Sequence, residues 1–130
     1  MQWEKTTGRK MHCCEGTING VPARFTVHTG RIETGRSRMF IGYFASVEID
    51  GEPVTGADSS GIVFALRNCA EKLRARGVVL DAPALSERFY ESGLSENSGW
   101  GYMRDGDDEP VHYIDRTKKY TRPPRYDSKS

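Results

Sequence analysis

Residues 39–49 read MFIGYFASVEI, and this stretch does most to decide the fold. Apolar side chains occupy every second position, which is the period of a β-strand with one face turned to a core. Asp50-Gly51 follows directly, and this dipeptide favours the left-handed backbone of a two-residue hairpin turn. The stretch therefore predicts a central antiparallel strand, with a short return strand over residues 52–55.

A second hairpin is predicted on the N-terminal side of this strand. Asn19-Gly20 is the same kind of turn signal, and it separates residues 11–17 from residues 23–29. Residues 30–38, which carry two glycines and three arginines, are expected to form a loop. A third hairpin is predicted near the C-terminus, with strands at 100–104 and 111–115.

Two helices are expected between these hairpins. Residues 59–76 hold apolar side chains at three- and four-residue spacing, and Gly77 suits the backbone that ends a helix. Residues 83–91 begin with Pro83 and carry Leu85 and Phe89, which predicts a shorter helix. We therefore expect an α+β fold of two layers: an antiparallel sheet of five or six strands with one long and one short helix packed on one face. Residues 1–115 form its single domain, and residues 116–130 form a basic extended tail.

Charge is sorted along the 130 residues. Residues 1–45 carry a net charge of +4, residues 46–115 carry −8, and residues 116–130 carry +5. Separated charge of this kind indicates surfaces that meet charged partners. No apolar run approaches the ~20 residues of a membrane span, and the first ten residues lack a secretory signal. With three cysteines and no recognisable disulfide pattern, the chain is predicted to be cytoplasmic, with no membrane partner.

Few residues offer catalytic or metal chemistry in a recognisable pattern. On a strand, His12 and Cys14 point to one side and Cys13 to the other, so at most two of them can share a metal. No second pair stands at zinc spacing, and we predict neither a metal nor a cofactor. A small enzyme with a cysteine or carboxylate site is the third functional alternative, and binding is expected rather than catalysis.

The C-terminal hairpin is the first candidate for a partner surface. It combines carboxylates with aromatic side chains, a mixture that suits a protein with a basic surface. The candidate residues are Glu96, Trp100, Tyr102, Asp105, Asp107, Asp108 and Glu109. They predict a stoichiometric protein inhibitor or adaptor, of the immunity-protein or mobile-element-inhibitor kind.

Basic residues in the arginine loop and the tail give the alternative function. They offer contacts to phosphates, and so predict a nucleic-acid-binding protein. The candidates are Arg31, Arg36, Arg38, Lys118 and Lys119. No helix-turn-helix, zinc finger or aromatic RNA-binding signature accompanies them, so the prediction depends on charge alone.

Overall fold

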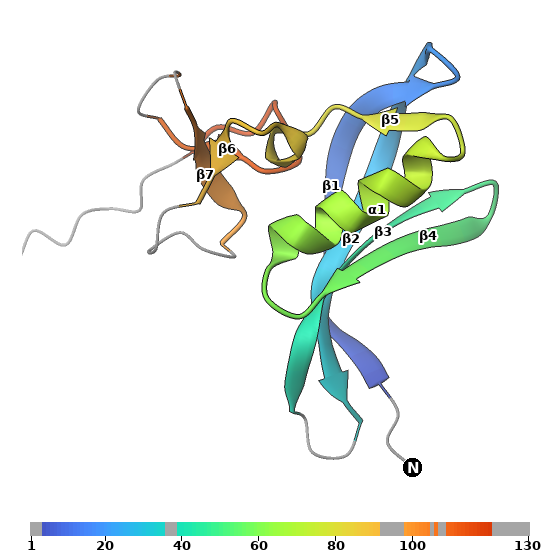
Figure 1. Cartoon of the computed structure of the whole chain (residues 1–130), viewed down its shortest axis with the longest axis vertical. Coiled ribbons are helices and arrows are strands. Elements are labelled where there is room, and N and C mark those ends of the chain that lie inside the picture. The colour runs from blue at the N-terminus through green and yellow to red at the C-terminus, as the bar shows by residue number, and fades with distance from the viewer. Residues whose placement is uncertain (1–3, 36–38, 92–97, 105, 107–108, 121–130) are drawn as a thin grey trace, which may run out of the picture.

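The computed structural model describes residues 4–35, 39–91, 98–104, 106 and 109–120. The main element is a five-stranded antiparallel sheet in the order β4-β3-β2-β1-β5. Four strands follow one another as a meander, and the fifth returns beside the first after a helix (Figure 1). The strands are β1 (Glu4–Ile18), β2 (Val21–Thr34), β3 (Phe40–Ile49), β4 (Glu52–Asp58) and β5 (Val78–Leu80).

The two predicted turn signals close the hairpins of this sheet. Asn19 and Gly20 have φ angles of 49° and 83°, and Asp50 and Gly51 have φ angles of 52° and 81°. Both residues of each turn are thus left-handed, as this type of hairpin requires. Residues 30–34, expected in a loop, instead continue β2 and pair with β1 and β3.

One helix, α1 (Ile62–Arg74), lies across one face of the sheet (Figure 1). Its apolar stripe is buried, and Leu66, Cys69 and Leu73 are each 0% exposed. They pack with Val27 and Val47 of the central strands in the main core cluster. The predicted helix is therefore confirmed, although it is shorter than residues 59–76. Within the described part of the chain, no helix has the length and apolarity that a bilayer crossing requires.

The second predicted helix, residues 83–91, is wrong, and with it the expected fold class. Only one turn of 3₁₀ helix forms, η1 (Pro83–Leu85), because Ser86 after it is extended, with φ −80° and ψ 142°. A helix of nine residues is marginal without strong packing. Phe89 instead belongs to a strand, β6 (Phe89–Tyr90), and pairs with Met103.

The described chain therefore has a single α-helix and two sheets, in place of two helices on one sheet. The smaller sheet has the order β6-β7-β8, with β7 (Trp100–Met103) and β8 (Val111–His112). Figure 1 shows it to one side of the larger sheet, with η1 between the two. Tyr113 ties the two parts together, because its carbonyl oxygen accepts from the Ala84 N–H and its hydroxyl reaches β2.

Residues 116–120, the first part of the predicted tail, contact the smaller sheet and Asp81, which directly follows β5 of the larger sheet. Lys119 forms an antiparallel bridge with Val111, and the ring of Tyr120 meets that of Trp100 at 5.3 Å between centroids. Arg116 forms an ion pair with Asp81 at 2.9 Å. These contacts place Lys118 beside the junction of the two sheets.

The close approach of α1 to β4 depends on Gly56. A methyl group on Gly56 would meet the backbone nitrogen of Cys69 and lie 2.5 Å from the carbonyl oxygen of Ala65. Since both atoms belong to the helix backbone, α1 would have to move. We expect Gly56→Ala to lower the free energy of unfolding by about 1–3 kcal/mol in urea denaturation. Ala57→Ser, an exposed neighbour, is the control and should change it by less than about 0.5 kcal/mol; equal effects would contradict the close packing.

Candidate functional site

A basic groove of about 550 Å³ lies where the large sheet meets the small one. Among the described residues, its lining includes three cations, Lys10, Arg31 and Lys118, and no carboxylate side chain. Aromatic and imidazole rings make up much of the remaining wall. The other lining residues are Gly8, His12, Thr29, Gly30, Tyr43, Ile62, Ser98, Gly99, Trp100, His112 and Tyr113.

A bulge in β1 sets which side chains reach this groove. The register between β1 and β2 shifts between Thr7 and Lys10, where Gly8 has a φ of 60°. Beyond the shift, Lys10 pairs with Thr29. Residues paired across antiparallel strands share a face. Lys10 therefore lies on the helix-covered face of the sheet, and the groove occupies the part of that face beyond the start of α1.

Arg31 and Tyr43 extend the same face, because they are paired across β2 and β3. The guanidinium of Arg31 lies 4.3 Å from the centroid of the Phe40 ring. Its Nε is also 3.9 Å from a carboxylate oxygen of Glu33. Arg31 is thus oriented by two neighbours, and Glu33 offsets part of its charge.

A buried polar cluster forms the floor between the two sheets. The Tyr113 hydroxyl donates to Thr29 Oγ1 at 2.9 Å, and His12 Nε2 lies 3.2 Å from each of these two oxygens. The rings of His12 and His112 are 4.9 Å apart between centroids. His12 Nδ1 is buried and has no hydrogen-bond partner among the described residues. The cluster fixes the small sheet against β1 and β2 while leaving one polar atom unpaired.

Both histidines are held in the neutral form. Burial lowers the pKa of His12 to about 4, and the positive charges of Lys118 and Lys10 add to the effect while Asp115 opposes it. Burial likewise lowers the pKa of His112 to about 4, with contributions from His12, Lys118 and Lys10 against Asp115. Burial raises the pKa of Tyr113 to about 12, although the hydrogen bond to Thr29 opposes this. At neutral pH the charge of the groove therefore comes from its lysines and arginine.

The predicted anion-contact residues meet only in part. Arg31 lines the basic groove from β2 and Lys118 lines it from the segment after β8, whereas Lys119 is exposed and forms a bridge with Val111 of β8. Arg36 and Arg38 lie outside the described residues. Lys10 joins Arg31 and Lys118 in the groove, where the bulge at Gly8 sets its position.

The predicted acidic partner surface is described for three residues. Trp100 is half-buried in the groove wall, with its ring edge-on to His112 at 5.1 Å. Tyr102 stacks on Tyr90 at 5.7 Å, and Glu109 is exposed. The remaining four predicted residues lie outside the described residues; they are Glu96, Asp105, Asp107 and Asp108.

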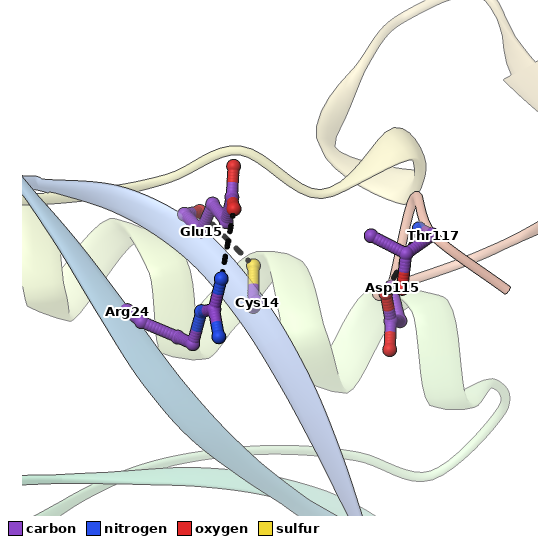
Figure 2. A network of polar contacts seen from close by, with 5 residues as sticks. All are labelled: Cys14, Glu15, Arg24, Asp115 and Thr117. Carbon is purple, nitrogen blue, oxygen red and sulfur yellow. Dashed lines mark hydrogen bonds and ion pairs between the residues drawn. The ribbon is translucent and has the colours of Figure 1, made fainter.

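A second depression, of about 250 Å³, lies over β1 and β2 near residues 115–117. Its cations are neutralised, because Arg24 pairs with Glu15 at 3.4 Å and Arg116 pairs with Asp81 at 2.9 Å. Figure 2 shows the Glu15–Arg24 pair beside Cys14, whose Sγ donates to the Glu15 carbonyl oxygen. This depression therefore has less free positive charge to bind an anion than the basic groove has.

In the described part of the chain, the cysteines and the possible metal ligands form neither a nucleophilic site nor a metal site. Cys13 is exposed, and burial raises the pKa of both Cys14 and Cys69 to about 11, so these two are poor nucleophiles. Among residues 4–35, 39–91, 98–104, 106 and 109–120, no three histidine, cysteine or carboxylate side chains gather as a metal site would require. Comparison of the chain with family models, curated proteins and solved structures finds no match.

Proposed function

We propose that the protein binds single-stranded nucleic acid in the basic groove. The observation that carries the proposal is the convergence of Lys10, Arg31 and Lys118 with Trp100 around one cavity, whose described lining residues include no carboxylate. Cations contact phosphates, and an aromatic ring offers a platform for an unpaired base. The groove thus combines the two interactions that single-strand binders use.

A single strand fits this site better than a duplex. The cavity of about 550 Å³ is within the range of sites that enclose a small ligand, roughly 300–1,000 Å³. A base must leave its stack to reach Trp100 in the wall, and this costs least in a strand that is not paired. The neutral state of His12 and His112 adds no further charge, so specificity for polyanions depends on the three cations.

The inhibitor or adaptor function stays a prediction. Four of its seven candidate residues lie outside the described chain, and Trp100 belongs to the basic groove. The positive lining of that groove gives no contact for a basic protein surface. The described residues therefore favour the nucleic-acid alternative.

The proposal predicts a defined loss of binding when the two lysines are removed. We expect the double variant Lys10→Ala/Lys118→Ala to bind a fluorescent twelve-nucleotide single strand at least about tenfold more weakly in an anisotropy titration, since two phosphate contacts are lost. For the unaltered protein, the logarithm of the association constant should fall with the logarithm of salt concentration with a slope of about −2, the value for three phosphate contacts to a single strand.

Lys72→Ala/Arg74→Ala is the matched control, because it removes the same charge from exposed positions near the other end of α1. It should change the affinity by less than about twofold. Equal losses in the two double variants would mean that only overall charge matters. That result, or no binding by the unaltered protein, would contradict the proposed function.

A further inference from the structure

The imidazole of His112 presents a hydrogen-bond donor that has no acceptor in the described part of the chain. Its Nδ1 accepts from the backbone N–H groups of Ile114 at 3.2 Å and Asp115 at 2.9 Å. The neutral ring must therefore carry its proton on Nε2. Among the described residues, none accepts a hydrogen bond from this Nε2.

The position of this nitrogen places it in the basic groove. A methyl group built on Gly99 would lie 4.0 Å from His112 Nε2, and both residues line the groove. Gly99 also has a φ of 93°, which disfavours any larger residue there. Position 99 therefore carries no side chain beside the Tyr113 ring and His112 Nε2.

Positive charge surrounds the same space. Lys10 and Lys118 are close enough to both imidazoles to help keep them neutral. Within the described residues neither lysine forms an ion pair, although the Asp115 carboxylate interacts with Lys118 and with both histidines, and Glu33 offsets part of the charge of Arg31. Two ammonium groups and an N–H donor together favour a ligand group with more than one negative charge.

The volume of the basic groove limits how many nucleotides of a nucleic-acid strand it can hold. A cavity of about 550 Å³ accommodates about one nucleotide. A phosphodiester within a strand carries one negative charge, whereas a phosphomonoester carries about 1.5–2 near pH 7.

We propose that the groove recognises a nucleotide carrying a phosphomonoester, with His112 Nε2–H and the ammonium groups of Lys10 and Lys118 contacting that phosphate and Trp100 contacting the base. The ligand is either the phosphorylated end of a single strand or a free mononucleotide. The inference rests on the proposed function, since it specifies which part of a nucleic acid the groove holds.

The test uses the full chain and four probes: an eight-nucleotide single strand with a 5′-phosphate, the same strand with a 3′-phosphate, the strand with neither, and a free nucleoside monophosphate as competitor. We expect one phosphorylated strand to bind at least about tenfold more tightly than the unphosphorylated strand. The free nucleotide should displace it if the end alone is recognised.

Two substitutions at His112 separate recognition from folding. His112→Asn keeps an acceptor near the Nδ1 position but lacks the Nε2–H, so the preference for a phosphorylated end should fall at least about fivefold. His112→Gln places an amide N–H near the Nε2 position and should keep more of that preference. The readout is the ratio of the affinities for the phosphorylated and unphosphorylated strands, which a loss of binding common to both strands leaves unchanged. If His112→Asn fails to fold, Lys118→Ala provides the same ratio from an exposed position.

The possible outcomes distinguish the two proposals. Equal affinity for all three strands would overturn the inference while the proposed function stands. Binding of the mononucleotide alone, with no strand bound, would overturn the proposed function and leave the phosphomonoester site. A preference that His112→Asn, His112→Gln and Lys118→Ala all leave unchanged would remove these side chains from the site.

Discussion

Leu66→Ala is expected to lower the free energy of unfolding by about 2–5 kcal/mol in urea denaturation. Leu66 lies at the centre of the apolar stripe of α1, is 0% exposed, and packs in the core between the helix and the sheet. Truncation removes buried methyl groups and leaves a cavity that close-packed neighbours cannot fill. Since a domain of this size is stable by only about 5–15 kcal/mol, the loss would be a large part of the total.

The matched control for this substitution is Phe64→Ala on the same helix. Phe64 is 52% exposed, so its truncation should cost less than about 1 kcal/mol although the side chain is larger. If Leu66→Ala cost less than about 0.5 kcal/mol, or no more than Phe64→Ala, the placement of α1 on the sheet would be wrong.

The parts of this fold that the sequence predicted correctly are those with local causes. Asn19-Gly20 and Asp50-Gly51 form turns because their own backbone preferences match the hairpin, and the strand and helix periods identify β3 and α1. The helix at 83–91 was a wrong prediction because its two apolar residues fit either element. Phe89 forms a strand because it pairs with Met103, and this partner lies outside the segment from which the helix was predicted.

The second sheet was predicted only in part. Its β7–β8 hairpin lies within the strands predicted at 100–104 and 111–115. The third strand, β6, had no signal, because two residues are too few for a period to show. The extension of β1 back to Glu4 likewise depends on a bulge at Gly8 that no alternation pattern marks. These elements exist because of their neighbours, and a sequence read segment by segment does not contain that information.

In the candidate site too, residue types could be predicted from the sequence, whereas their arrangement in space could not. Arg31 and Lys118 could be selected by charge, and Trp100 by residue type, but they were assigned to two different surfaces. Tyr113 and His12 are separated by 101 positions, and only the packing of the two sheets brings them together. The one available signal was His12 on the core-facing side of a predicted strand, where a polar ring needs a partner.

The buried histidines predict a stability that falls as the solution is acidified. His12 and His112 have their pKa lowered from 6.5 to about 4 in the folded protein, so the unfolded chain takes up protons first. The free energy of unfolding is therefore unaffected above about pH 6.5 and decreases as the pH falls towards 4. At about 1.36 kcal/mol per pKa unit, the decrease is on the order of 3 kcal/mol for each histidine.

The loss of stability caused by the histidines falls between about pH 6.5 and 4, and the Asp115 carboxylate titrates mostly below this interval. The pKa of Asp115 is lowered by its hydrogen bonds with Thr117, so this group stays ionised through most of the interval. Urea denaturation at intervals from pH 7.5 to 4.5 should show the loss, and His112→Asn should reduce it by roughly half because one of the two titrating groups is gone.

His28→Asn provides the comparison, since it removes a histidine from the opposite face of the sheet, where His28 lines a different depression with Arg9 and Phe44. We expect His28→Asn to keep the steep pH dependence of the unaltered protein. A flat stability profile between pH 6.5 and 4.5 in the unaltered chain would mean that the two imidazoles can be protonated in the folded state. The sheets would then have to separate enough to hydrate them, and the packed junction that forms the basic groove would be wrong.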